Sequence, residues 1–262
     1  MENLIKELEA RKKSLSPDEK KKLSDEVLDK LYAVYPFNKF KYTISHLIAK
    51  EIISLDDYLR IRSEYIARNR YLYLFELAPR TFGETWGQRH LMELVEEFEL
   101  PSKDKDPNYA GQYDLVLEGI RVEVKASRAV KKMGGDTLAN KALVSNSKLK
   151  FDMNYQQIKP SCCDVFVWIA VWRDKIDYWV FPSSVIQEPH DGGYFKTVHL
   201  SPQHRKEGPE PTCEREIFEG QIHINDKNYI EFEPYKVSAR DIYNKIKEYS
   251  LDSNIRRCDK GY

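Results

Sequence analysis

Several features of membrane, disulfide-bonded or zinc-binding proteins are missing from this sequence. It has no run of about 18 or more apolar residues, so we expect no membrane span. Its first residues, Met1 to Lys6, are charged and helix-forming, unlike a signal peptide. The four cysteines form no Cys-x-x-Cys pair and have no histidine at zinc-finger spacing. We therefore expect a reduced, cytoplasmic protein without structural zinc or disulfides, in which Cys162 and Cys163 are buried thiols.

An excess of charge of one sign is also missing. The 42 Lys and Arg residues equal the 42 Asp and Glu residues, which disfavours a protein that coats DNA without sequence preference. The charges are nevertheless uneven, because basic residues clearly outnumber acidic ones between positions 121 and 150. We expect a local basic surface there, with three of its residues as candidate DNA contacts: Arg128, Lys131 and Lys132.

Motifs of several enzyme classes are likewise missing. The sequence contains no Gly-rich phosphate loop, no Ser-His-Asp triad pattern and no dinucleotide fingerprint, so we expect no nucleotide cofactor. What remains is a chain of 262 residues, 41% hydrophobic and 32% charged, which is typical of a globular protein. This length suits one large domain, or a catalytic core with a smaller attached module.

Residues 1–77 have the pattern of a helical region. Ser16-Pro17-Asp18-Glu19 supplies an N-cap, a proline at the first helical position and acids in the first turn. Apolar residues then recur at helical spacing, and two further segments with this spacing meet near Ile53-Ser54. This pair is compatible with a DNA-binding helix-turn-helix or with a packing bundle, and we favour the bundle.

Residues 78–182 predict a mixed α/β core. We expect a helix over 83–98, a β-hairpin of 113–117 and 120–125 around Glu118-Gly119, and a helix over 148–159 ended by Pro160. Two apolar strands, 165–172 and 176–181, follow. Residues 183–262 predict a loop-rich part with short strands and a terminal helix that completes the same domain. The predicted fold class is therefore α/β, a mixed β-sheet flanked by helices, with a helical N-terminal region.

The hairpin contains residues suited to metal-dependent hydrolysis. Alternate residues of a strand share a face, so Glu123 and Lys125 project together while Val122 and Val124 point to the core. The hairpin returns Asp114 to face Glu123, and two close carboxylates repel unless a cation lies between them. Mg²⁺ needs only one or two carboxylates, and it activates a water for attack on a phosphate. The alternative is an exposed strand face with a salt bridge worth less than about 1 kcal/mol.

With Asp114 and the Glu123-Val124-Lys125 triplet, the stretch from about 81 to 181 resembles the PD-(D/E)xK nuclease superfamily, and within it the type II restriction endonucleases. The resemblance implies that Asp114, Glu123 and the carbonyl of Val124 bind Mg²⁺, or Mn²⁺ in its place. It implies that Lys125 acts as the water-associated base or charge stabiliser. Tyr113 departs from the family pattern, since it stands where the proline that names the motif would be.

The resemblance also implies residues outside the hairpin. Family members often place a glutamate on the preceding helix near the metal, for which Glu84 is the candidate, with Gln88 one turn later. Many carry a glutamine on a later helix, for which Gln157 is the candidate contact to DNA. In a Gly/Pro-rich C-terminal segment, Lys196, His204 and Arg205 are candidate DNA contacts, or residues of an ordinary surface loop.

The expected activity is cleavage of double-stranded DNA at a specific sequence, leaving 5′-phosphate and 3′-hydroxyl ends, as the resemblance implies. Cutting both strands of a palindrome requires two active sites, so we expect a homodimer. Two alternatives stay open. One is a DNA repair or structure-specific nuclease on the same core, and the other is a DNA-binding module without catalysis.

Overall fold

The computed structural model describes residues 10, 13–22, 36–132, 137–187, 199–206 and 214–259. For residues 20–22, 84, 187, 199–206, 214–219 and 251–259 it describes the backbone alone. The chain forms two compact units, residues 1–68 and 69–262. The first unit thus ends before the predicted boundary at residue 77, because residues 69–77 belong to the second unit.

The described part of the first unit is helical, as predicted. Helix α2 (Pro17–Lys22) begins with the expected cap: Ser16 N donates to Glu19 Oε2 at 2.8 Å, and Glu19 N donates to Ser16 Oγ at 3.3 Å. Helices η1 (Phe37–Phe40), α4 (Lys41–Ala49) and α5 (Leu55–Arg68) follow. The Phe37 ring packs edge-on against two tyrosines of α5, which closes a small apolar core. The apolar periodicity of 23–34 lies outside the described residues.

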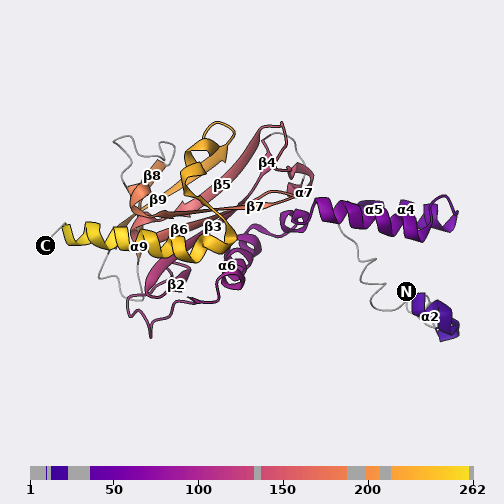
Figure 1. The fold of residues 1–262 in the computed structure, drawn as a ribbon, viewed down its shortest axis with the longest axis horizontal. Coiled ribbons are helices and arrows are strands. Elements are labelled where there is room, and N and C mark those ends of the chain that lie inside the picture. Colours follow the sequence, from indigo (N-terminus) through magenta and orange to yellow (C-terminus); the bar gives the residue numbers. More distant parts are fainter. Residues whose placement is uncertain are drawn as a thin grey trace. The chain divides into compact units, whose positions relative to one another are not determined.

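The second unit is built on a six-stranded sheet with the order β1-β2-β3-β6-β7-β10 (Figure 1). Strands β3 and β6 run parallel, and the other neighbouring pairs run antiparallel, so the sheet is mixed. The predicted α/β fold with a helical N-terminal region is confirmed. The strands are β1 (Phe98–Glu99), β2 (Leu115–Leu117), β3 (Ile120–Arg128), β6 (Val165–Val171), β7 (Ile176–Pro182) and β10 (Lys236–Val237).

A second sheet has the order β4-β5-β9-β8. Its strand β5 contributes Tyr155, whose ring stacks on Trp168 of β6 with centroids 4.6 Å apart and whose hydroxyl donates to the Ile169 carbonyl at 3.0 Å. Both aromatic side chains are buried and belong to the hydrophobic core. The strands are β4 (Val130–Lys131), β5 (Phe151–Ile158), β8 (His199–Lys206) and β9 (Glu214–Asn225).

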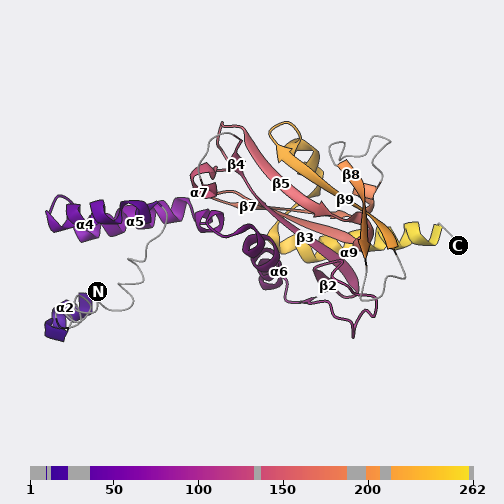
Figure 2. The same ribbon diagram turned by 180° about the vertical axis from the view of Figure 1, so that it is seen from behind.

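Helices complete the second unit. The π-helix η3 (Thr81–Gly87) continues into α6 (Gln88–Leu94), and η3 packs on β3. The long α9 (Ile242–Asp259) packs on β7 and β6; it crosses in front of the six-stranded sheet in Figure 1 and behind it in Figure 2. None of the helices in the described ranges has the length and apolarity to cross a membrane. The short helices are η2 (Leu72–Phe75), α7 (Leu138–Lys141), η4 (Pro160–Cys162), α8 (Ser184–Gln187), η5 (Tyr229–Tyr235) and η6 (Ala239–Asp241).

Three local predictions are wrong. The predicted helix over 148–159 is strand β5, because Met153 and Tyr155 are buried while Asn154 and Gln156 are exposed, an alternation with the strand period. The helix predicted to reach residue 98 ends at Leu94, since Phe98–Glu99 pairs with β2. The strands of the C-terminal part are not short, because β9 spans 12 residues and pairs with both β5 and β8.

Candidate active site

The hairpin of β2 and β3 places the predicted acidic residues opposite each other. Its turn consists of Glu118 and Gly119, which have φ values of 49° and 84°, as a two-residue hairpin turn requires. Leu115 pairs with Val122, so the register carried one residue further sets Asp114 opposite Glu123. The Asp114 backbone N–H also donates to the Val122 carbonyl at 3.0 Å, which extends the hairpin by this residue.

The two faces of β3 have different neighbours. One face carries Val124 and Ala126 and packs against Gly87, where an added Cβ would lie 3.4 Å from the Ala126 Cβ and 3.8 Å from the Val124 side chain. The other face carries Glu123 and Lys125, which pair in register with Phe166 and Trp168 of β6. Because Tyr155 of β5 stacks on Trp168, the second sheet lies over this face.

Asp114 is held by two hydrogen bonds, one to each carboxylate oxygen. Gln88 Nε2 donates to Oδ1 at 2.8 Å, and the Val124 backbone N–H donates to Oδ2 at 2.8 Å. Burial raises the pKa of Asp114, although the charge of Lys125 and these hydrogen bonds oppose that rise. The carboxylate is therefore fixed in orientation but poorly solvated.

Glu123 is the most deeply buried of the site residues, at 3% exposed. Its Oε1 forms an ion pair with Lys125 Nζ at 2.6 Å. Burial raises the pKa of Glu123 to about 7, and the negative charge of Asp114 adds to the rise while Lys125 opposes it. Burial alone would lower the pKa of Lys125, but the negative charges of Glu123 and Asp114 outweigh it and raise the pKa. The expected strand-face salt bridge exists, but it is buried rather than exposed.

All three residues line one pocket of about 960 Å³ in the second unit. Its walls come from η3 and α6, the segment 109–114, strand β3 and strand β5, so it lies between the hairpin and the second sheet. Ser127 Oγ donates to the Asn154 carbonyl at 2.9 Å, which ties β3 to β5 across this region. The pocket brings together side chains that are far apart in the sequence: Arg80, Gln88, Asp114, Glu123, Lys125, Asn154, Gln156, Gln157 and Lys159.

The donor set fits a hard divalent cation of the Mg²⁺ type. Two carboxylates lie in the same pocket, their mutual charge is destabilising, and the described contacts leave Glu123 Oε2 without a hydrogen bond. Among the described side chains, no group of three or more His, Cys, Asp and Glu lies close enough to hold a metal. That excludes a histidine- and cysteine-rich transition-metal site there, whereas Mg²⁺ needs only one or two carboxylates with water completing its shell.

Comparison with known proteins adds no relative. No family model, no curated protein and no solved structure matches this chain. The function must therefore be argued from the pocket itself.

Two residues that the resemblance singles out beyond the hairpin, Gln88 and Gln157, line the pocket. Gln157 lines it, but from a bulge in strand β5 instead of from a helix, with φ at 55°. Glu84 lies in η3, and its side chain is among those not described. Gln88, on the next turn from Glu84, is the residue of this helix that contacts Asp114.

Arg128 lines the pocket, but its guanidinium already donates hydrogen bonds to backbone carbonyls of the second unit. Nη1 donates to the Leu74 carbonyl at 2.9 Å and to the Leu77 carbonyl at 2.8 Å, and the group lies 4.3 Å above the Phe82 ring. Burial lowers the pKa of Arg128 to about 10. These contacts favour a role in joining residues 74–77 to the sheet over a role in binding phosphate.

Of the remaining DNA-contact candidates, only Lys131 and Lys132 have side chains that the structure describes, and neither lines the pocket. Lys131 lies in β4, and Lys132 comes just after it. His204 and Arg205 belong to strand β8, which corrects the expectation of a loop, and only their backbone is described. Lys196 lies outside the described residues.

Sequence reasoning missed Lys159. This lysine is only 8% exposed, and it lines the pocket beside the two acids. The only signal in the sequence is a lysine directly before Pro160, and the helix predicted over 148–159 gave no indication that its side chain faces the pocket. Tyr109 was missed as well, and it lines the pocket from the loop before β2.

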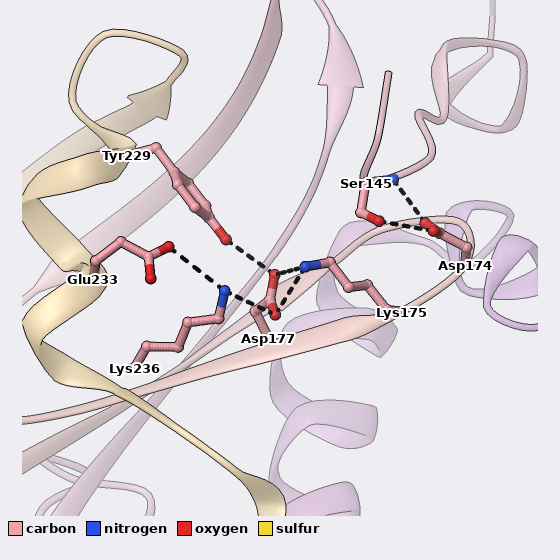
Figure 3. Close-up of polar contacts among 7 residues, drawn as sticks. All are labelled: Ser145, Asp174, Lys175, Asp177, Tyr229, Glu233 and Lys236. Carbon is pink, nitrogen blue, oxygen red and sulfur yellow. Dashed lines mark hydrogen bonds and ion pairs between the residues drawn. The ribbon is translucent and has the colours of Figure 1, made fainter. Parts of the chain in front are cut away.

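A second buried acid lies outside the pocket lining. Asp177 of β7 accepts a hydrogen bond from the Tyr229 hydroxyl at 3.0 Å and pairs with Lys175 at 2.9 Å and Lys236 at 3.4 Å (Figure 3). Burial would raise the pKa of Asp177, but Lys175 and Lys236 lower it overall. In contrast to Glu123, this carboxylate has partners for both oxygens, which indicates a stabilising role.

Proposed function

We propose that this protein is a Mg²⁺-dependent DNA endonuclease that hydrolyses phosphodiester bonds to leave 5′-phosphate and 3′-hydroxyl ends. The observation that carries the proposal is the buried set of Asp114, Glu123 and Lys125 in one large pocket. A buried carboxylate whose pKa is raised to about 7 destabilises the fold at neutral pH, so a structural role does not account for it. Perturbed groups of this kind are typical of active sites.

Each residue has a role that follows from its contacts. Gln88 and the Val124 N–H fix the orientation of Asp114, and Asp114 and Glu123 present oxygens to the cation. Mg²⁺ bound there would polarise the phosphate and lower the pKa of a water ligand, and Mn²⁺, which takes similar oxygen ligands, would substitute. The Lys125 ammonium would donate to a phosphate oxygen and offset the charge that grows during attack. The raised pKa of Lys125 favours this cationic role over that of a base.

The substrate class rests on the pocket and its surroundings. A volume of about 960 Å³ with amide and cationic side chains on its walls suits a segment of nucleic-acid backbone. The second sheet, which lies over the same face of β3, provides surface beyond the hairpin for reading bases. We therefore propose a restriction enzyme of type II that acts as a homodimer on double-stranded DNA.

The test is a digest of unmethylated phage DNA by the purified protein, with Mg²⁺ or with EDTA. Discrete fragments that appear only with Mg²⁺ are expected, and their ends should be religated by DNA ligase without prior kinase treatment, because the 5′-phosphate is retained.

Other outcomes separate the alternatives. Cleavage without discrete bands, together with preference for mismatched or branched duplexes, would favour a repair or structure-specific nuclease. Binding of DNA without cleavage under any of these conditions would favour the non-catalytic module and would overturn the proposal. That last outcome would leave the energetic cost of burying Glu123 unexplained.

A further inference from the structure

Lys159 lies in an unusual environment for a lysine. It follows β5 directly, and its carbonyl accepts a hydrogen bond from Cys162 N at 3.1 Å, which fixes the backbone at the start of η4. Only 8% of the residue is exposed, and it forms part of the pocket wall that faces Asp114 and Glu123. The backbone of Lys159 is therefore held by secondary structure rather than by a surface loop.

The two lysines of the pocket differ in their partners. Lys125 pairs with Glu123 at 2.6 Å. The Lys159 side chain has neither an ion pair nor a hydrogen bond with any residue in the described ranges. Burial raises the pKa of both acids, and the positive charge of Lys159 opposes that rise in each, so its ammonium lies within electrostatic reach of both. An ammonium on the pocket wall without a close anion is available to a phosphate of a substrate that enters the pocket.

We propose that Lys159 binds a backbone phosphate of the substrate, next to the phosphate attacked at Asp114 and Glu123. This inference rests on the proposed function for the identity of the polyanion. Lys159 makes its contact when DNA binds, before bond cleavage, whereas Lys125 contributes as charge develops on the phosphate. Loss of Lys159 should therefore weaken binding, and loss of Lys125 should mainly slow the chemical step.

The experiment measures binding of a fluorescein-labelled duplex, cut from phage DNA, in EDTA over a series of salt concentrations. For Lys159→Gln we expect binding weaker by about tenfold or more, as for a lost charged hydrogen bond. We also expect the slope of log K against log salt to fall by about 0.9, the value for one phosphate contact. Lys159→Arg should keep the slope. The control Lys103→Gln, at an exposed lysine outside the pocket lining, should leave both quantities unchanged.

Where cleavage is measured as well, Lys159→Gln should raise KM with little change in kcat. A second measurement uses the wild-type protein, so that the inference can be tested even if the Lys159→Gln variant does not fold. DNA should protect Lys159 from reductive methylation more strongly than it protects Lys103, as read by mass spectrometry. An unchanged slope in a folded Lys159→Gln variant, or equal protection of both lysines, would overturn the inference. Binding through Lys159 without cleavage would contradict the nuclease proposal and leave this inference standing.

Discussion

Glu123 should make the metal-free protein less stable as the pH rises. Its pKa in the folded protein is about 7, against an ordinary value of 4.5, so the folded state holds this proton more tightly than the unfolded state does. Stability therefore falls with increasing pH between these values, and the full loss is present above pH 7. Since each pKa unit is worth about 1.36 kcal/mol, the loss from this group reaches at most about 3 kcal/mol.

The perturbation that isolates this effect is Glu123→Gln, which keeps the shape and removes the titration. Urea unfolding of both proteins in EDTA, at pH values from below 4.5 to above 7, gives the difference in the free energy of unfolding. The wild type should lose up to about 3 kcal/mol relative to the variant across this range. The loss of the Lys125 ion pair in the variant changes its free energy of unfolding by a constant amount. The dependence of that free energy on pH is not affected. The matched control is Glu97→Gln, at an exposed glutamate that has no ion pair or side-chain hydrogen bond with the residues that the structure describes.

Added Mg²⁺ should reduce the fall for the wild type, because a bound cation stabilises the charged carboxylate. Parallel stability curves for the wild type and Glu123→Gln would refute the reasoning, since they would mean that the buried carboxylate titrates as it does in water.

Three further changes have expected outcomes. Gly87→Val should destabilise the protein by about 1–3 kcal/mol in urea unfolding and slow cleavage, because its side chain would collide with Ala126 and displace η3 from β3. Unchanged values would contradict this packing. Arg128→Ala should cost about 2 kcal/mol through its lost carbonyl contacts but leave the salt dependence of DNA binding unchanged, and a reduced slope would instead assign it to phosphate. Asp177→Asn should destabilise the protein at neutral pH, and the difference from wild type should disappear as the pH falls through the lowered pKa of Asp177; a difference that persists in acid would contradict the ion pairing.

The sequence was most informative where local chemistry decides the structure. The Glu118-Gly119 turn predicted the hairpin, because Gly119 adopts the positive φ of a two-residue turn without strain and the tight turn fixes the register. That register is enough to bring Asp114 opposite Glu123. The apolar segment of β6 was equally clear, because a strand buried on both faces has no polar alternation.

The sequence was ambiguous where two periodicities overlap. Phe151, Tyr155 and Ile158 have the spacing of a helix face, and the bulge at Tyr155–Ile158 returns Ile158 to the buried side of a strand. Pairing with β9, a contact between distant segments, decides in favour of the strand. Since Lys159 follows this strand, its direction into the pocket could not be derived before β5 was known.

The burial of the site was also beyond sequence reasoning. The pattern predicted that Glu123 and Lys125 share a face, but a half-exposed strand face would show the same pattern. The low exposure of Glu123 arises because the second sheet lies over β3, and that sheet uses residues from 130 to 225. Long-range packing of this kind sets the pKa of a carboxylate, and no local motif reports it.

The most direct test of the central claim is the single-turnover rate of phage DNA cleavage in Mg²⁺ for wild type, Asp114→Asn, Lys125→Gln and the control Glu118→Gln. Glu118 lies in the hairpin turn and outside the described pocket lining, so its variant should cleave at the wild-type rate. The Asp114 and Lys125 variants should remain folded and bind DNA, yet cleave at least about a hundredfold more slowly, as expected when transition-state stabilisation is lost. Wild-type rates in both variants, or no cleavage by any of the four proteins, would contradict the account.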